Sequence, residues 1–277
     1  MDIDHLRKWI GRSETVEDVA SEVPLAGLAA LLDRAAPWKD FMPPLAHWLY
    51  FLGHARQSDI DVDGHPHRGG FLPPIDLPRR MWAGGRLTFE ADIPVGASIT
   101  RRSTIADVTA KTGSTGNMVF VTVHHEIVAD GVIAVREEQD IVFREAPKTG
   151  TMAARNVSTA PEAAERTRRV NPDPTQLFRF SALTFNAHRI HYDRDYCRDV
   201  EGYPGLVVQG PFTAMLLMDH LRMTLPDARV RSFKFRAQSP LFDTAPFESC
   251  LNTHEGGADL WAQGPAGKAM VAEARLA

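Results

Sequence analysis

The sequence of 277 residues has only two cysteines, Cys197 and Cys250, which excludes a disulfide framework and a four-cysteine zinc site. It also lacks a long apolar run: the most apolar stretch, 41–53, spans about 13 residues and includes His47, too short to cross a bilayer. The first residues, Met-Asp-Ile-Asp-His, lack the basic start and apolar segment of a signal peptide. We therefore expect a cytoplasmic protein without a membrane segment.

The sequence has no excess of positive charge either. Its 31 Lys and Arg residues stand against 35 Asp and Glu, a net charge of −4 with no charged tail, which argues against nucleic-acid binding. A hydrophobic content of 44% and a mean hydropathy of −0.22 are typical of a globular chain with a large core. Proline and glycine are plentiful, with 19 and 20 residues, and many of them fall in 57–85 and 202–211.

Hydrophobic periodicity divides the chain into two similar halves. Apolar residues at three- and four-residue steps predict helices within 1–35 and over 44–56, and the long loop that follows, 57–85, has a length typical of functional loops. From Arg86 the period becomes two, which predicts antiparallel strands over 86–93, 118–128 and 135–144. The second half repeats this order, with an apolar helix over 210–221 and strands over 231–237, 247–255, 257–263 and 268–276.

A short internal repeat supports a duplication. Phe89-Glu-Ala-Asp-Ile-Pro94-Val aligns with Phe235-Arg-Ala-Gln-Ser-Pro240-Leu, and each follows the apolar helix of its half. The segment 147–172 has few large apolar residues and is predicted to be a linker. We therefore predict an α+β protein with a unit over 1–146, which has a helical N-terminus and a Pro/Gly-rich loop, a linker over 147–172 and a second unit over 173–277.

The segment 184–193, Thr-Phe-Asn-Ala-His-Arg-Ile-His-Tyr-Asp, is rich in groups that can do chemistry. His191 suits acid/base work, because an imidazole can accept and return a proton near neutral pH. A helix beginning at Gly210 would present its N-terminal N–H groups to developing negative charge. From the residues alone an alternative stays open, in which His191 and Asn186 only satisfy backbone groups in a turn.

This segment, together with Gln209-Gly210, resembles the signature of MaoC-like, R-specific enoyl-thioester hydratases and dehydratases of the hot-dog superfamily. The form Thr-Phe-Asn-x-His-Arg-Ile-His-Tyr-Asp is similar, more narrowly, to type-2 hydroxyacyl-thioester dehydratases and to mesaconyl-C4-CoA and itaconyl-CoA hydratases. The N-terminal half resembles the same proteins in two runs, His65-Pro-His-Arg-Gly-Gly-Phe-Leu-Pro-Pro74 and Leu77-Pro-Arg-Arg-Met-Trp-Ala-Gly-Gly85. The resemblance therefore extends over most of the chain.

The resemblance implies a double hot-dog fold, two curled antiparallel sheets each wrapped around a central helix, with an acyl thioester of coenzyme A or acyl carrier protein held between the halves. It implies reversible hydration of a 2,3-enoyl thioester, with His191 as general acid/base and the Gly210 N–H polarising the carbonyl. Asn186 stands where most relatives have aspartate, and because an amide cannot abstract a proton it would orient the water. Either His191 then acts alone, or a carboxylate such as Asp193 or Asp195 completes the pair, or the site is inactive.

Cationic and aromatic side chains complete the predicted site. A free carboxylate on the acyl group, as in mesaconyl or itaconyl thioesters, requires a forked guanidinium. The predicted substrate-binding residues are Arg79, Arg80, Trp82, Arg189 and Tyr192. No metal is expected, because the pair His188-x-x-His191 lacks a third ligand at convincing spacing, and no cofactor is expected beyond the coenzyme A of the substrate.

The sequence thus predicts a hydro-lyase, with a short branched dicarboxylyl-CoA as the favoured substrate. The alternatives are a 3-hydroxyacyl-ACP or -CoA dehydratase for unbranched fatty chains, a hot-dog thioesterase and a non-catalytic acyl-thioester binding module. A thioesterase should carry an acidic residue where Asn186 stands. Two fused units already mimic the usual hot-dog dimer, so a homodimer is compatible with the sequence but not required.

Overall fold

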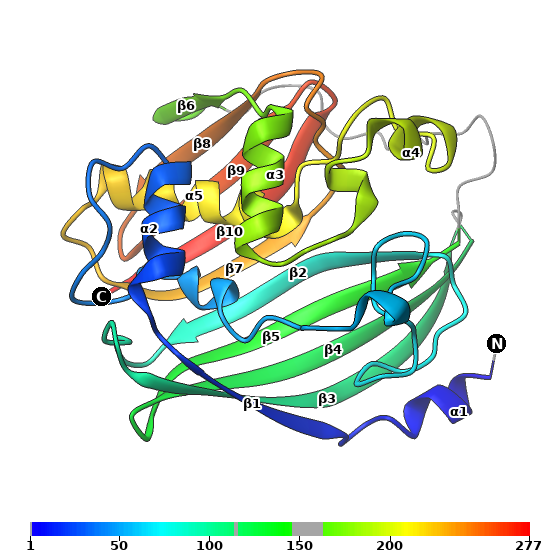
Figure 1. The fold of residues 1–277 in the computed structure, drawn as a ribbon. Coiled ribbons are helices and arrows are strands. Elements are labelled where there is room, and N and C mark those ends of the chain that lie inside the picture. Colours follow the sequence, from blue (N-terminus) through cyan, green and yellow to red (C-terminus); the bar gives the residue numbers. More distant parts are fainter. Residues whose placement is uncertain (1, 114–115, 146–162) are drawn as a thin grey trace.

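The computed structural model describes residues 2–113, 116–145 and 163–277, in which ten strands form one antiparallel sheet (Figure 1). The strand order is β1-β3-β4-β5-β2-β7-β10-β9-β8-β6, so strands of the two halves occupy opposite ends of the sheet. The strands are β1 Ser13–Val19, β2 Arg79–Phe89, β3 Ser98–Gly113, β4 Gly116–Ala129, β5 Val132–Arg144, β6 Arg166–Val170, β7 Val230–Ala237, β8 Phe247–His254, β9 Gly257–Gly264 and β10 Gly267–Leu276. The α+β class and the strands predicted for both halves are confirmed.

The two halves of the sheet meet where β2 pairs with β7. Leu87 of β2 lies opposite Phe233 of β7, and the offset between these two residues equals that between Phe89 and Phe235 in the internal repeat. Each half therefore contributes the same strand to the junction, as a two-fold relationship requires. A Cβ atom at Gly85 would lie 2.8 Å from the ring of Phe235, so glycine permits the close approach of the two strands.

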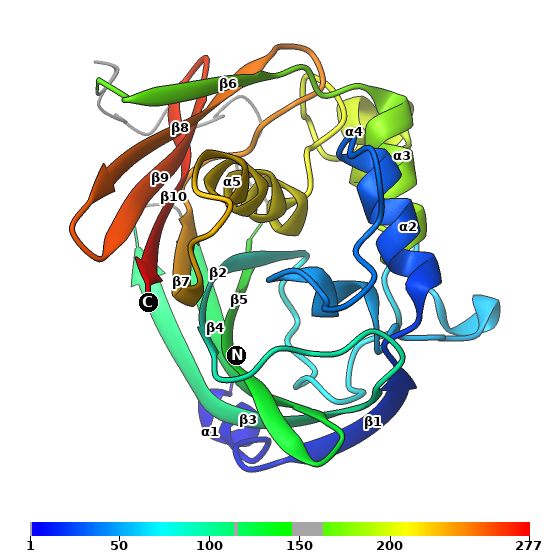
Figure 2. The same cartoon turned by 90° about the vertical axis from the view of Figure 1, so that its left-hand side faces the viewer.

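The long helix α5, Gly210–Thr224, fills the C-terminal half, as predicted. Every residue from Phe212 to Leu221 is buried, because α5 lies between the concave face of the sheet and the helices α2 and α3 (Figure 2). The other helical elements are α1 Ile3–Arg7, α2 Glu22–Leu31, α3 Pro174–Leu183 and α4 Arg194–Asp199, with the 3₁₀ turns η1 Ala46–Leu49, η2 Gln57–Asp59 and η3 Arg189–His191. None of the helices in the described ranges has the length and apolarity needed to span a membrane.

The helix predicted over 44–56 is wrong, since only the single turn η1 is helical there. Leu45 and Phe51, with φ angles of 72° and 57°, take left-handed backbone conformations on either side of this turn and prevent an α-helix. The apolar periodicity of this segment arises because Leu45 and Leu49 are fully buried in the main core, although the chain around them is not an α-helix. In the described residues the N-terminal half therefore has no counterpart as long as α5.

Other differences from the predicted elements concern edges and ends. Within 1–35, Ser13–Val19 forms the edge strand β1, paired with β3, and Gly11 at φ 84° lies in the turn between α1 and this strand. Neither β3 nor α3 was predicted; α3 begins after Asp173, whose carboxylate caps it by accepting from the N–H of Gln176. The loop predicted over 57–85 ends earlier, because β2 begins at Arg79.

The predicted linker is described only in part. Residues 146–162 lie outside the described residues, and the strand β6 within the remaining part pairs with β8 of the C-terminal half-sheet. The boundaries 1–146, 147–172 and 173–277 therefore stay a prediction.

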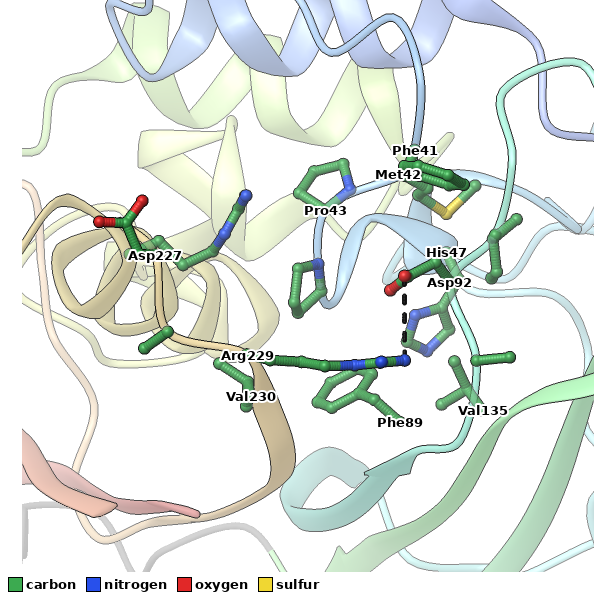
Figure 3. Close-up of a pocket in the computed structure, with 15 residues that line it drawn as sticks. Phe41, Met42, Pro43, His47, Phe89, Asp92, Val135, Asp227, Arg229 and Val230 are labelled. Atoms are coloured by element: carbon green, nitrogen blue, oxygen red, sulfur yellow. Dashed lines mark ion pairs between the residues drawn. The ribbon is translucent and has the colours of Figure 1, made fainter. Parts of the chain in front are cut away.

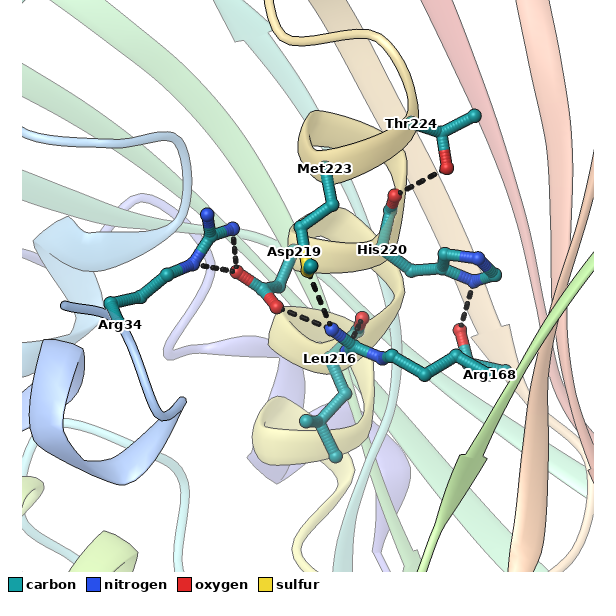
Figure 4. Close-up of polar contacts among 8 residues, drawn as sticks. Arg34, Arg168, Leu216, Asp219, His220, Met223 and Thr224 are labelled. Carbon is teal, nitrogen blue, oxygen red and sulfur yellow. Dashed lines mark hydrogen bonds and ion pairs between the residues drawn. The ribbon is translucent and has the colours of Figure 1, made fainter.

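A buried ionic cluster on α5 joins three distant segments (Figure 4). Asp219 is 5% exposed, and its carboxylate pairs with the guanidinium of Arg34, which follows α2, and with Nη1 of Arg168 on β6 at 2.6 Å. Arg168 also donates to the carbonyl oxygen of Leu216 at 2.8 Å. The carboxylate of Asp219 thus holds the loop after α2 and the edge strand β6 against the central helix α5.

Candidate active site

A cavity of about 960 Å³ lies between the two halves of the protein. Its walls come from β4 and β5, the beginning of α5, and residues of the two Pro/Gly-rich segments 57–85 and 202–211, which the sequence singled out. The predicted site residues that line it are Arg80, Trp82, Asn186, His191 and Gly210, whereas Arg79, Arg189 and Tyr192 lie outside it. The fold therefore gathers most of the predicted site from three separate segments, namely β2, the segment 184–193 and the start of α5.

His191 is the last residue of η3 and is buried. Its Nδ1 lies 2.7 Å from the carbonyl oxygen of Val207, and because a carbonyl oxygen can only accept, Nδ1 carries the proton and Nε2 has a free lone pair. Burial lowers the pKa of His191 to about 4, although the hydrogen bond to Val207 acts in the opposite direction. The ring is therefore a neutral base with a fixed tautomer.

Asn186 is held in the turn that leads to His188. Its Oδ1 accepts from the backbone N–H of His188 at 3.0 Å, which leaves its NH₂ group without a bonded partner among the described residues. The two carboxylates nearest in sequence do not complete the site: Asp193 caps α4 and Asp195 is exposed, and neither lines the cavity. The amide can therefore orient a water molecule but not ionise.

Gly210 is the first residue of α5 and lines the cavity. The preceding residue, Gln209, is almost fully buried, and its Nε2 donates to the carbonyl of Leu177 at 2.9 Å and to the hydroxyl of Ser181 at 3.0 Å. These bonds anchor the start of α5 to α3. The first N–H groups of a helix have no partner within the helix, so the Gly210 N–H is placed to stabilise negative charge in the cavity.

The imidazoles of His65 and His188 also line the cavity near His191, and the sequence did not reveal either as a site residue. The ring centroids of His65 and His188 are 4.1 Å apart and those of His188 and His191 are 5.3 Å apart, so the ring of His188 packs against both of the others. Asp63 lies 3.0 Å from Nδ1 of His65 and also accepts from the backbone N–H of His65 at 2.9 Å. The result is an Asp–His dyad beside the predicted catalytic histidine.

Backbone contacts dock the loop that carries this dyad onto the segment 184–193. The carbonyl oxygen of Asp63 accepts from the N–H of Arg189 at 2.9 Å. Gly64 has a φ of 91°, and a Cβ atom there would lie 1.8 Å from the carbonyl oxygen of Ala187, so only glycine fits. The run His65-Pro-His-Arg-Gly-Gly was the available signal in the sequence, but only this contact brings His65 to His188.

Burial and charge set the protonation of these groups. Burial lowers the pKa of His188 to about 2, and the neighbouring rings and Arg80 add to the effect. The pKa of His65 is also lowered, mainly by burial, while the hydrogen bond to Asp63 acts in the opposite direction and the charge of Arg80 opposes protonation. Burial opposes the ionisation of Asp63, but its hydrogen bonds with His65 outweigh this and hold its pKa below the usual range.

The adjacent arginines of β2 have different surroundings, as alternation along a strand requires. Arg79 pairs with the carboxylate of Glu201 at 2.9 Å, donates to its carbonyl oxygen at 2.6 Å and stacks on the ring of Tyr203. Arg80 lines the cavity and forms no hydrogen bond or ion pair within the described part of the chain. Burial lowers the pKa of Arg80, and the nearby Asp63 carboxylate acts in the opposite direction. Arg80 is therefore the available cation in this wall.

Of the remaining predicted binding residues, one lines the cavity and two lie outside it. Trp82 lines the cavity, and its ring packs against Trp48 with the centroids 4.8 Å apart. Arg189 instead pairs with Asp193 at 2.7 Å outside the cavity, and Tyr192 is 46% exposed. Substrate-binding roles for Arg189 and Tyr192 stay a prediction.

Asp63, His65 and His188 also bring one potential metal-ligand atom each within 4.8 Å of one another. Nδ1 of His65 is already hydrogen-bonded to Asp63, however, and the charge of Arg80 acts on both imidazoles. A positive neighbour disfavours a second cation, so the group is better described as a hydrogen-bonded dyad next to a third ring.

The N-terminal half-sheet adds charged side chains to the same cavity. Glu137 is buried, lies 3.0 Å from Nε2 of His47 and accepts from the indole of Trp48 at 3.0 Å. These contacts hold the carboxylate of Glu137 in the part of the cavity wall that the N-terminal half forms. Cationic side chains from the sheet also line the cavity, namely Arg101, Lys111, Arg144 and Arg236.

A smaller cavity of about 340 Å³ shares His47 with the larger one (Figure 3). Arg229 and Asp92 form an ion pair of 3.8 Å between residues of its wall. None of the predicted site residues lines this cavity, so the chemistry belongs to the larger one.

Comparison with known sequences agrees with this arrangement. The model of the family described as hydroxyacyl-thioester dehydratase type 2 matches residues 45–243. Mesaconyl-C(4)-CoA hydratase of Chloroflexus aurantiacus is 48% identical over 262 residues, which cover 94% of this chain and 93% of the relative. Both matches contain the segments that build the cavity.

Solved structures share the fold at low sequence identity. A MaoC-like dehydratase from Phytophthora capsici superimposes with a TM-score of 0.72 at 12% identity, covering 100% of this chain and 98% of the other. A Mycobacterium tuberculosis protein described as a double hot-dog fold gives a TM-score of 0.56 at 13% identity, covering 99% and 97%. The predicted double hot-dog fold is thus confirmed, except that the two half-sheets are continuous through β2 and β7 and, among the described residues, only the C-terminal half surrounds a long helix. The chain belongs to the hydroxyacyl-thioester dehydratase type 2 family.

Proposed function

We propose that the protein catalyses the reversible addition of water to a 2,3-enoyl-CoA thioester, with a short acyl group that bears a free carboxylate, such as mesaconyl-C4, as its preferred substrate. The observation that carries this proposal is the state of His191. Its Nδ1 is committed to Val207, and its neutral Nε2 is left for the cavity beside Asn186 and Gly210. The identity of 48% to a mesaconyl-C(4)-CoA hydratase supports the choice of acyl group.

The residues suit the chemical steps of hydration. Water adds at C3 of the conjugated double bond, and negative charge develops on the thioester oxygen as an enolate forms. The Gly210 N–H and the N-terminus of α5 stabilise this charge, Asn186 orients the water, and His191 transfers a proton. Pro211 has no N–H, so Gly210 is the first backbone donor of the helix.

Arg80 is the residue we assign to the carboxylate of the acyl group. It lies in the same wall as Trp82 and has no hydrogen-bonded partner of its own in the described residues. A guanidinium can bind a carboxylate through two parallel hydrogen bonds, which a neutral acyl chain cannot accept. Arg79 cannot take this role without breaking its contacts to Glu201 and Tyr203.

Coenzyme A is the carrier that we infer, because cationic side chains for its phosphates line the same cavity, among them Lys111, Arg144 and Arg236. The chemistry needs no cofactor beyond the coenzyme A of the substrate. A cytoplasmic location fits an acyl-CoA substrate and the two free, buried cysteines. A homodimer stays a prediction.

The second candidate is dehydration of unbranched 3-hydroxyacyl thioesters. Apolar side chains of β4 and β5 line part of the cavity and would accommodate an aliphatic chain, namely Met118, Phe120, Ile127, Ile141 and Val142. The two candidates share the reaction and differ only in the acyl group.

The test is a spectroscopic panel that follows loss of the conjugated thioester absorbance with mesaconyl-C4-CoA, crotonyl-CoA and 2-octenoyl-CoA. We expect turnover with kcat/KM at least about 10-fold higher for mesaconyl-C4-CoA, since one charged hydrogen-bonded contact contributes about 1.5–3 kcal/mol. Preference for 2-octenoyl-CoA would support the second candidate. Binding of all three thioesters without turnover would leave only an acyl-thioester binding module.

A further inference from the structure

We propose that His65, held by Asp63, is a second catalytic acid/base that exchanges a proton with the oxygen at C3, while His191 exchanges the proton at C2. This inference rests on the proposed hydration reaction. Its basis is the arrangement of groups in the cavity wall. His191 is bonded to the segment that leads to Gly210, the ring of His188 packs against those of His191 and His65, and Arg80 lines the same wall.

Hydration moves protons at two places, because the water oxygen loses one and C2 gains one. His191 has only one free ring nitrogen, since the other donates to Val207. Asn186 cannot carry a proton, and Asp193 lies outside the cavity. His65 packs against His188, which packs against His191, and among these three rings His65 is paired with a carboxylate, that of Asp63, so it can take the second proton.

The arrangement of these groups matches the order of reacting atoms in a short dicarboxylyl thioester. The bond from His191 to Val207 ties that ring to the segment that leads into Gly210, where the thioester carbonyl binds. Arg80 lines the same cavity, and its charge acts on His65 and His188 but is not among the influences on His191, so Arg80 lies on the side of His65 and His188. With the thioester at Gly210 and the carboxylate at Arg80, C2 lies toward His191 and C3 toward His65.

The dyad has the arrangement of an acid/base histidine with its orienting carboxylate. Asp63 accepts from Nδ1 of His65, so Nε2 is the nitrogen left for proton transfer. The charged and titratable groups that interact with His65 are Asp63, His188, His191, Arg80 and Arg68. Asp63 stabilises the imidazolium, and a substrate carboxylate bound to Arg80 cancels the repulsion from that guanidinium.

The proton balance is simplest in the direction of dehydration. Nε2 of His191 takes the C2 proton, the C–H electron pair forms the enolate, and the Gly210 N–H binds the enolate oxygen. The C2=C3 bond then forms as the C3–O bond breaks, and the leaving oxygen takes the proton from Nε2 of His65 and departs as water. The two imidazoles share one proton throughout, which solvent returns from His191 to His65, and hydration is the reverse.

The first experiment compares hydration of mesaconyl-C4-CoA by His65→Gln and by the matched control His67→Gln, an exposed histidine of the same loop. We expect kcat to fall about 100-fold or more for His65→Gln, a typical effect of losing a general acid/base, and to stay unchanged for His67→Gln. Replacement of Asn186 by Asp in the His65→Gln background supplies a new proton carrier and should restore part of the lost rate.

The positioning role of Asp63 is tested by the pH profile of dehydration. His65 acts as an acid in that direction, so the rate falls as pH rises through its pKa in the complex. Asp63→Asn removes the charge that favours the imidazolium and should move this basic limb to lower pH. An unchanged limb with a uniformly lower rate would overturn the role of Asp63.

The second experiment separates the two histidines. Methylsuccinyl-C4-CoA, a saturated thioester with no hydroxyl group to lose, is incubated in D₂O, and deuterium at C2 is measured by mass spectrometry. We expect exchange to persist in His65→Gln and to disappear in His191→Ala, because only C2 reacts. This retained exchange also shows that the variant is folded.

Three outcomes would overturn the inference: unchanged hydration in His65→Gln, loss of C2 exchange together with hydration in that variant, or loss of wild-type activity on EDTA treatment with recovery on added zinc. The last result would assign Asp63, His65 and His188 to a metal instead. If the wild-type protein hydrates no enoyl-CoA at all, the proposed function is wrong, and the inference that rests on it is wrong as well.

Discussion

Nδ1 of His191 lies 2.7 Å from the carbonyl oxygen of Val207, three residues before the central helix begins. This single contact fixes the tautomer of the histidine and connects it to the N–H that is placed to bind the thioester oxygen. The group that transfers a proton and the group that stabilises charge are thereby joined through one short segment, 207–210.

Replacement of His191 by Ala should reduce kcat for hydration by about 100- to 10,000-fold, the usual range for a general acid/base. The fold should persist, which near-UV circular dichroism will show. The matched control is His254→Ala, an exposed histidine on β8 that lies outside the cavity and should leave kcat unchanged. Retained hydration in His191→Ala would contradict the assigned role.

Replacement of Arg80 by Ala should distinguish the two arginines of β2. We expect kcat/KM to fall about 10- to 100-fold for mesaconyl-C4-CoA and by less than about threefold for crotonyl-CoA. Only mesaconyl-C4-CoA has a free carboxylate, and the substitution removes the guanidinium that binds it. Arg79→Ala should lower kcat/KM for both substrates by a similar factor, since Arg79 contacts Glu201 and Tyr203 and does not line the cavity. Steady-state kinetics with both substrates measures the difference. An equal fall in Arg80→Ala would exclude the carboxylate clamp.

Gly64→Ala should displace the loop of the Asp63–His65 dyad. The new Cβ would lie 1.8 Å from the carbonyl oxygen of Ala187, at a φ of 91°. Gly69→Ala is the matched control, because Gly69 has a similar φ of 89° in the same loop but its nearest neighbour is 3.6 Å away. We expect Gly64→Ala to lower hydration activity at least about 10-fold through misplacement of the dyad, and Gly69→Ala to keep most of it. Equal activities would show that the loop contact is dispensable.

Asp219→Ala should destabilise the fold by about 3–5 kcal/mol, because it leaves the guanidinium groups of Arg34 and Arg168 beside the buried helix without their carboxylate. Urea unfolding followed by circular dichroism gives the free energy of unfolding. Asp195→Ala removes an exposed partner of Arg198 and should change it by less than about 1 kcal/mol. A small effect in Asp219→Ala would mean that the cluster adds little to stability.

Acidification should destabilise the protein before its carboxylates titrate. Burial lowers the pKa of His191 and of His125 to about 4 in the folded state, whereas both regain their ordinary value near 6.5 on unfolding. Between pH 6.5 and 4 the unfolded chain therefore binds more protons than the folded protein. As the pH is lowered through this range, the free energy of unfolding decreases by on the order of 1 kcal/mol per pH unit for each group. Urea unfolding at several pH values measures this slope. His125→Asn should make it shallower, and an unchanged slope would contradict burial as its cause.

Much of the C-terminal half was predictable because its signals are local. The apolar periodicity of 210–221 and the alternation in β7 to β10 each follow from a single element that buries one side. The same periodicity misled over 44–56, where Leu45 and Leu49 are buried on an irregular chain with left-handed residues. Strand β3 gave no comparable signal, because Arg101 and Ser103 interrupt the apolar residues on its inward side and its register with β4 shifts between Ile105 and Asp107.

The sequence by itself determined the family signature, the candidate catalytic histidine and the helix that begins at Gly210, because these are encoded within one short segment. Only the tertiary structure decided which arginine of β2 reaches the cavity, since the register of β2 between β5 and β7 sets the direction of each side chain. Only the tertiary structure brought the Asp63–His65 dyad to His188, more than a hundred residues away in the chain, because the contact depends on Gly64 lying against the carbonyl of Ala187. Such contacts depend on the packing of distant segments, which local periodicity does not record.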